Sequence, residues 1–181
     1  MSKRYKDFKV TDTSLPEGLE ALRRAVEVEK EEMGLYMEYA RKTSDPTGKN
    51  IFISLARDEE GQIKILEEQI ALLEKRLPWK RYEQRSSEIQ DYMSHMMPVE
   101  KREKSTSGKD QLGMLRAALA REREAIDFFR TQARELGDEN AKDMYRKLAA
   151  MDEAHYDMIQ AQIDAIEGTG FWFGIPEFSL V

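Results

Sequence analysis

Residues 55–70 read LARDEEGQIKILEEQI, and residues 148–163 read LAAMDEAHYDMIQAQI. Aligned with Leu55 on Leu148, an offset of 93 positions, the two segments share their opening Leu-Ala and their closing Gln-Ile. At the same offset the stretches from about 20 to 74 and from about 113 to 167 match without a gap. Self-similarity at a fixed spacing is the signature of a duplicated structural unit. The sequence therefore predicts two copies of one helical hairpin.

The first copy, residues 17–76, carries apolar residues every three or four positions, which is the period of one helix face. This spacing predicts a helix over about 17–43. It predicts a second helix whose apolar stripe opens at Phe52 and ends before Pro78, and the segment SDPTG at 44–48 breaks the pattern between the two. Two long helices joined by a short turn lie antiparallel.

The second copy, residues 110–167, repeats the pattern after a connection over 77–109 with weak periodicity. The helices that it predicts cover about 110–136 and 138–167, and Asp138 is placed to cap the last one. Two such hairpins joined by one long crossover make an all-α four-helix bundle.

Three further expectations concern the rest of the chain. A short helix is expected near 86–97, inside the crossover. The tail 168–181 is rich in aromatic residues, and we expect it to pack on the bundle or on a second subunit. The whole chain, 1–181, has the length of a single domain.

Composition limits the classes of function. The net charge is −6, and 35% of the residues are charged with both signs mixed, so we expect neither a nucleic acid nor a membrane surface as partner. No cysteine is present, which excludes disulfides and cysteine-ligated metals within these residues and favours a reducing, cytoplasmic location. The N-terminus MSKRYKDFKV lacks the apolar segment of a signal peptide, and no apolar run has the length of a membrane span.

Four acidic residues interrupt the apolar stripes, one on each predicted helix: Glu29, Glu59, Glu122 and Asp152. Each lies in the middle of its stripe, so all four side chains are predicted to point into the bundle at a similar height. Burying an ionised carboxylate costs several kcal/mol, so these charges need a partner. Buried arginine or lysine, shared protons and metal ions are the alternatives. The stripes contain no basic residue, and two divalent cations would balance four negative charges.

The spacing of the acids supports a metal. His155 follows Asp152 by three positions, and Gln62 follows Glu59 by three, so each pair projects from one helix face and can converge on one ion. His95, the other histidine, lies in the crossover and is interpreted as a solvated residue.

At these residues the chain resembles the rubrerythrin-like branch of the ferritin-like di-iron carboxylate proteins. The family pattern Glu-x6-Tyr is similar to Glu29 and Tyr36, and Leu-Ala-x-x-Glu-x-x-His is similar to residues 55–62 and 148–155. The resemblance covers nearly all of residues 20–167. It implies that Glu29 and Gln62 are terminal ligands of one metal, Glu122 and His155 of the other, and Glu59 and Asp152 the bridges.

Three positions depart from the family pattern. Gln62 stands where the family has His, Asp152 stands where it has Glu, and Ala125 stands where many rubrerythrins keep an additional carboxylate. The resulting centre is lopsided, because the Gln62 side has lost its imidazole. Tyr36 either orients a carboxylate through its hydroxyl, without being a ligand itself, or only packs in the core.

The resemblance implies an oxidoreductase whose di-iron pair reduces peroxide or dioxygen. Electrons would come from an external donor protein, since the four-cysteine rubredoxin domain of many rubrerythrins needs residues that are missing here. The alternatives are a non-catalytic metal-binding or iron-handling bundle, with a single metal or zinc, and a metal-free dimeric scaffold. We expect a homodimer in each case.

Overall fold

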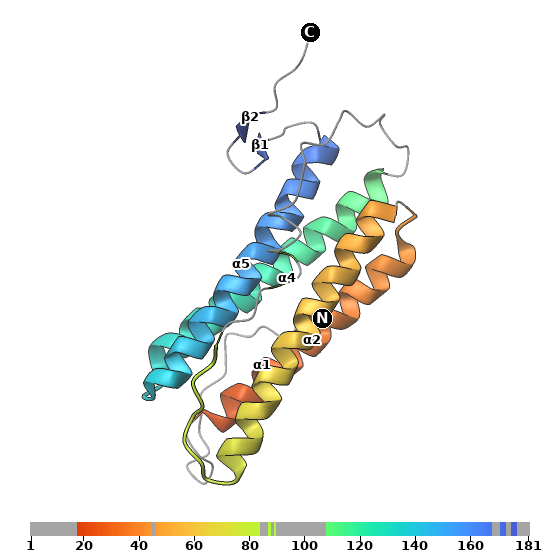
Figure 1. The fold of residues 1–181 in the computed structure, drawn as a ribbon. Coiled ribbons are helices and arrows are strands. Elements are labelled where there is room, and N and C mark those ends of the chain that lie inside the picture. Colours follow the sequence, from red (N-terminus) through yellow and green to blue (C-terminus); the bar gives the residue numbers. More distant parts are fainter. Residues whose placement is uncertain are drawn as a thin grey trace.

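The structure is a computed structural model that describes residues 18–44, 46–83, 87, 89, 108–167, 171–172 and 175–176. In this part of the chain the fold is a bundle of four long helices. The helices are α1 (Leu19–Lys42), α2 (Pro46–Glu74), α4 (Gly108–Glu135) and α5 (Glu139–Glu167). Helix α1 packs along α2, α4 packs along α5, and α1 also contacts α4 (Figure 1). The predicted all-α bundle of two repeated hairpins is confirmed.

The helix ends show how the sequence sets the boundaries. Asp138 caps α5, because its Oδ1 accepts the backbone N–H groups of Asn140 at 2.8 Å and Ala141 at 3.1 Å, as predicted. The apolar stripe expected to open at Phe52 lies inside α2, but the helix itself begins at Pro46, so the last three residues of the segment 44–48, which was expected to break the pattern, are helical. Proline favours the first turn of a helix, where its missing N–H costs no bond.

Gly18 starts α1 in a left-handed conformation, with φ of 85°. A Cβ atom built on Gly18 would lie 2.5 Å from Cζ2 of Trp79. Glycine is therefore required here both by the backbone and by the close approach of the crossover.

The described start of the crossover, residues 75–83, turns back from the end of α2 and runs along α5 (Figure 1). Gln69 holds it by donating from Nε2 to the Lys80 carbonyl at 3.0 Å and accepting the Lys80 N–H at 3.1 Å. The Lys147 ammonium on α5 donates to the Tyr82 carbonyl at 2.8 Å. The crossover is thus tied to both hairpins.

Three predictions fall largely outside the described residues. His95 lies outside them, and so does the short helix expected near 86–97, apart from Ser87 and Ile89. In the tail, β1 (Phe171–Trp172) pairs antiparallel with β2 (Ile175–Pro176), and β1 contacts α5. The packing of the tail and the extent of the domain over 1–181 stay predictions.

The apolar core forms two clusters, one toward each end of the bundle. One contains Leu22, Phe129 and Leu148, and the other contains Phe52, Leu115 and Ile159. Because the helices are antiparallel, the segments between these clusters meet at mid-height. Those segments carry the acidic residues of the stripes. Among the described helices, none is long and apolar enough to span a membrane.

Candidate metal centre

The middle of the bundle holds a cluster of buried polar side chains contributed by all four helices. All six residues that the sequence selects as metal ligands are 0% exposed. They are Glu29 from α1, Glu59 and Gln62 from α2, Glu122 from α4, and Asp152 and His155 from α5. The structure brings all six together, and we refer to them, with Glu32 and Asp58 described below, as the central cluster.

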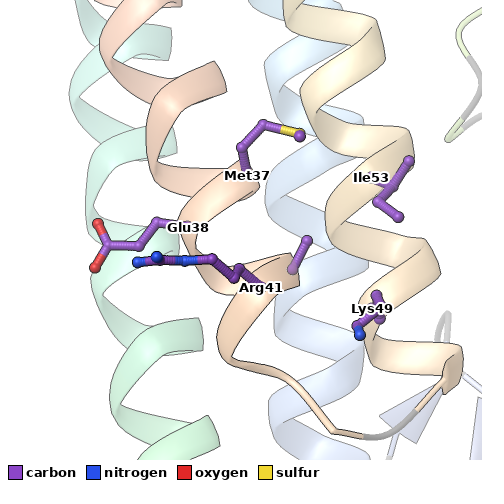
Figure 2. A pocket seen from close by; sticks show the side chains of 6 residues that line it. Met37, Glu38, Arg41, Lys49 and Ile53 are labelled. Atoms are coloured by element: carbon purple, nitrogen blue, oxygen red, sulfur yellow. The ribbon is translucent and has the colours of Figure 1, made fainter.

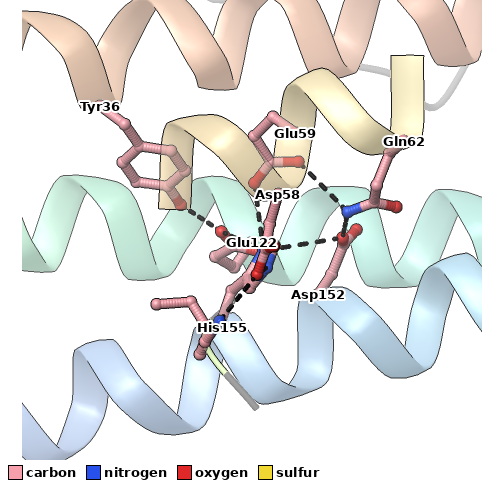
Figure 3. A network of polar contacts seen from close by, with 8 residues as sticks. Tyr36, Asp58, Glu59, Gln62, Glu122, Asp152 and His155 are labelled. Carbon is pink, nitrogen blue, oxygen red and sulfur yellow. Dashed lines mark hydrogen bonds and ion pairs between the residues drawn. The ribbon is translucent and has the colours of Figure 1, made fainter. Parts of the chain in front are cut away.

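His155 turns one ring nitrogen toward the carboxylates and the other toward a single acid. Its Nδ1 lies 3.1 Å from Oε1 of Glu59 and 3.6 Å from Oε1 of Glu122, whereas its Nε2 lies 3.3 Å from Oδ2 of Asp58 (Figure 3). With the proton on Nε2, the ring donates to Asp58 and keeps the Nδ1 lone pair free. This arrangement is typical of a metal-ligating histidine, whose outer nitrogen is held by a carboxylate.

Asp58 is a functional residue that the sequence analysis missed. It is 6% exposed, and its Oδ2 also accepts the backbone N–H of Ile89 in the crossover at 3.0 Å. Asp58 therefore links the crossover to His155. The available signal was its position directly before Glu59, but neither of these partners is near it in the sequence.

Glu32 is the second residue missed. It follows Glu29 by three positions and precedes Tyr36 by four, so it shares their helix face, and it is 1% exposed. Carboxylate oxygens of Glu29, Glu32 and Glu59 all lie within 4.8 Å of one another. The spacing could have identified Glu32, but the sequence prediction took only one acid from each helix.

Tyr36 performs both roles that the sequence left open. Its hydroxyl donates to Oε1 of Glu122 (Figure 3). Its ring stacks on Phe52 with centroids 6.3 Å apart. It therefore positions a carboxylate from α4 while filling the core beside it.

Gln62 faces the two acids that are expected to bridge the metals. Its Nε2 donates to Oδ1 of Asp152 at 2.7 Å and to Oε2 of Glu59 at 3.2 Å (Figure 3). Its Oε1 is buried without a hydrogen-bond partner. Gln62 thus acts as a donor that holds Glu59 and Asp152 together.

Electrostatics show how unfavourable the cluster is without a counter-charge. Burial raises the pKa of Glu29 well above its ordinary value, and the carboxylates of Glu59 and Asp152 raise it further. Burial also raises the pKa of Asp152 well above its ordinary value, and Glu122 adds to this effect. Burial alone would lower the pKa of His155, but Glu59 and Glu122 outweigh it and leave that pKa well above its ordinary value.

The donor set fits metal ions. Ten buried side-chain nitrogen or oxygen atoms lack a hydrogen-bond partner within the described residues, and eight of them belong to the central cluster. No lysine or arginine is buried in the described part of the chain, which removes one of the alternatives for neutralising the acids. Carboxylate and imidazole groups whose ligand atoms converge within 4.8 Å suit divalent cations.

A surface hollow lies away from the central cluster. It has a volume of about 680 Å³ and lies over α1 and α2 (Figure 2). Its lining residues are Met37, Glu38, Ala40, Arg41, Lys49 and Ile53. None of these belongs to the central cluster, so the chemistry of the chain is expected in the bundle interior.

The chain matches a known protein family. The model of the Rubrerythrin family matches residues 20–163, which include the whole central cluster. No curated protein and no solved structure matches the chain.

Proposed function

Because this chain belongs to the rubrerythrin family, we propose that its central cluster holds two divalent metal ions and that the loaded protein is an oxidoreductase. A di-iron pair is the leading form of the cofactor, and hydrogen peroxide or dioxygen is the substrate. The observation that carries this proposal is the set of eight unpartnered atoms that the four helices bury at mid-height, together with carboxylate and imidazole ligand atoms that lie within 4.8 Å of one another in overlapping groups of three.

The proposed ligand assignment follows the family pattern. Glu29 and Gln62 would be terminal ligands of one metal and Glu122 and His155 of the other. Glu59 and Asp152 would bridge the two metals. When bound, a reduced di-iron pair supplies the two electrons that convert one hydrogen peroxide and two protons into two waters.

The other residues of the centre have supporting roles. Asp58 fixes the tautomer and orientation of His155, and Tyr36 holds Glu122 in place. The two apolar clusters above and below keep bulk water away from the carboxylates. The 181 residues contain no cysteine and thus no cysteine-ligated site for electron entry, and an external donor protein is part of the proposal.

Reconstitution with ferrous iron tests the proposal. We expect about two iron ions per chain and consumption of peroxide in the presence of a reductant. Glu122→Ala should lose metal and activity together, because it removes a terminal carboxylate. Glu124→Ala is the matched control, since Glu124 lies on the same helix with its side chain 48% exposed. If Glu122→Ala retains both the metal and the activity, the proposal is wrong.

A non-catalytic metal-binding or iron-handling protein is the second candidate. The observation that favours it is Gln62, whose amide donates to two acids where the family has an imidazole. It predicts bound metal, such as a single ion or zinc, without peroxide turnover. A metal-free scaffold instead predicts a melting temperature that chelators do not change. The homodimer and the cytoplasmic location remain parts of the proposal.

A further inference from the structure

Glu32 gives the α1 side of the centre a carboxylate that the α4 side lacks. It lies one helical turn after Glu29, is 1% exposed, and has an Oε2 without a hydrogen-bond partner. Its counterpart 93 positions later is Ala125, which is 1% exposed and has no polar side-chain atom. Glu32 therefore adds a charged oxygen from α1, and its oxygens lie within 4.8 Å of those of Glu29 and Glu59 and also of those of Glu122 and Asp152.

The carboxylates on this side form a built site. Both oxygens of Glu29 are buried and unpartnered, and oxygens of Glu29, Glu32 and Glu59 lie within 4.8 Å of one another. Three acids at this spacing repel one another unless they are protonated or share a cation. Oxygen ligands from three carboxylates are a typical environment for a hard divalent ion.

Gln62 is a poor candidate for the missing ligand. The NH₂ group of its side chain already donates to Glu59 and Asp152, and an amide NH₂ group has no lone pair available to bind a metal. A rotation that turned Oε1 inward would break both bonds and would leave the NH₂ group without these acceptors. Glu32 can supply a charged oxygen while Gln62 keeps its bonds.

We propose that the two metal positions of this centre differ in chemistry. Glu32 replaces Gln62 as a ligand, so that Glu29, Glu32 and Glu59 form an all-carboxylate position for a hard cation such as Mn²⁺. Asp152, His155 and Glu122 form the other position, where the imidazole favours Fe²⁺ or Zn²⁺. Glu59 is shared between the two positions, since its oxygens lie within 4.8 Å of ligand atoms in both groups. This inference rests on the proposed function, because it requires two bound metals.

Sequential loading with two metals tests the assignment. Metal-free protein receives one equivalent of Zn²⁺ and is then titrated with Mn²⁺, and free Mn²⁺ is counted by its electron paramagnetic resonance signal. The wild type should keep the Zn²⁺ and bind about one Mn²⁺ per chain, because His155 gives Zn²⁺ a preferred position.

Three variants separate the possible ligands. Glu32→Gln should weaken Mn²⁺ binding by about ten-fold or more, since even outer-shell partners of a metal are worth about 10–100-fold. It should leave Zn²⁺ binding unchanged. Gln62→Leu should keep the Mn²⁺. Glu31→Gln is the matched control, because Glu31 lies on the same helix with its side chain 51% exposed.

The outcomes distinguish this inference from the proposed function. If Gln62→Leu loses the Mn²⁺ and Glu32→Gln retains it, Gln62 is the ligand and the inference is wrong. If the wild type binds neither ion, the proposed function fails as well. Should Glu32→Gln not fold, Glu32→Asp repeats the test with the charge retained and the oxygens withdrawn by one methylene. Unchanged Mn²⁺ affinity in Glu32→Asp would also overturn the inference.

Discussion

Replacing Glu29 by methionine should stabilise the metal-free protein and weaken the metal-loaded one. Glu29 is 0% exposed, and neither of its oxygens has a hydrogen-bond partner. Replacing buried ionic groups by apolar side chains of similar size commonly stabilises a protein by about 1–4 kcal/mol. Methionine matches glutamate in length and in helix propensity, so the packing of α1 should be kept.

The size of the effect can be expressed as a melting temperature. In a chain of this length each kcal/mol shifts the midpoint by roughly 2–4 °C, so a gain of about 2 kcal/mol raises the metal-free midpoint by roughly 4–8 °C. A ligand at about 100 times its Kd stabilises by about 2.7 kcal/mol per site. Loss of one metal site should therefore reduce the rise in melting temperature on metal addition by roughly 5–11 °C.

The pH dependence has a defined sign. Because burial raises the folded-state pKa of Glu29 well above the ordinary value of 4.5, its contribution to stability is fully present below about pH 4.5 and is lost as the pH rises through the folded-state pKa. The advantage of Glu29→Met without metal should thus be larger at pH 8 than at pH 5.

Calorimetric melting in chelator and in saturating metal measures both effects. Glu27→Met is the matched control, because Glu27 lies on the same helix with its side chain 65% exposed, and such changes stay within about 0.5 kcal/mol. The reasoning is refuted if Glu29→Met melts at a lower temperature than the wild type in chelator, or if metal raises the melting temperature of both proteins equally. Glu29 would then be a satisfied structural residue.

Three further predictions address the scaffold and its link to the centre. Gly18→Ala should destabilise the protein by about 1–3 kcal/mol in denaturant titration, since the new Cβ would sit on a left-handed backbone and clash with Trp79. Gly34→Ala, at a mid-helix position with open space, should instead stabilise the protein by about 0.5–1 kcal/mol. Asp58→Asn should weaken metal binding by about 10–100-fold in chelator competition, because His155 loses its anionic partner. Gln69→Leu should lower the free energy of unfolding by about 1–3 kcal/mol, because it leaves the Lys80 backbone groups unpaired. Gln162, its counterpart in the second copy, makes no such pair of backbone hydrogen bonds, so Gln162→Leu should cost less than about 0.5 kcal/mol in the same titration.

The bundle and the six selected residues of the centre were predictable, because both depend on local periodicity and on one fixed offset. An acid in the middle of an apolar stripe has to point inward wherever the helix packs. Glu32 shares the stripe of Glu29 and Tyr36 and is 1% exposed, whereas its neighbour Glu31 is exposed and pairs with Arg121 at 2.6 Å. The same helical spacing therefore separates these two neighbouring acids, and Glu32 was predictable as well.

Asp58, in contrast, could not be assigned from the sequence. Its two partners, His155 and the N–H of Ile89, lie on another hairpin and in the crossover. Contacts of this kind depend on how the two hairpins are set against each other, and the pattern of one helix carries no information about that. The same limit applies to Gln62, because its donor role depends on carboxylates from two helices.

The differences between the two copies follow a consistent chemical logic. The core positions Leu22 and Leu115, like Leu55 and Leu148, are identical, since both ends of the bundle need the same volume filled. The centre diverges at two linked positions. His155 has Asp58 as its carboxylate partner. In the other copy, Gln62 stands at the position that corresponds to His155, and Met151 at the position that corresponds to Asp58. A neutral amide needs no carboxylate behind it, so Met151 is compatible with Gln62. The amide at position 62 and the thioether at position 151 thus change one half of the site together, and Glu32, whose oxygens approach carboxylates of both halves within 4.8 Å, adds a charged oxygen ligand of the kind that a harder ion prefers.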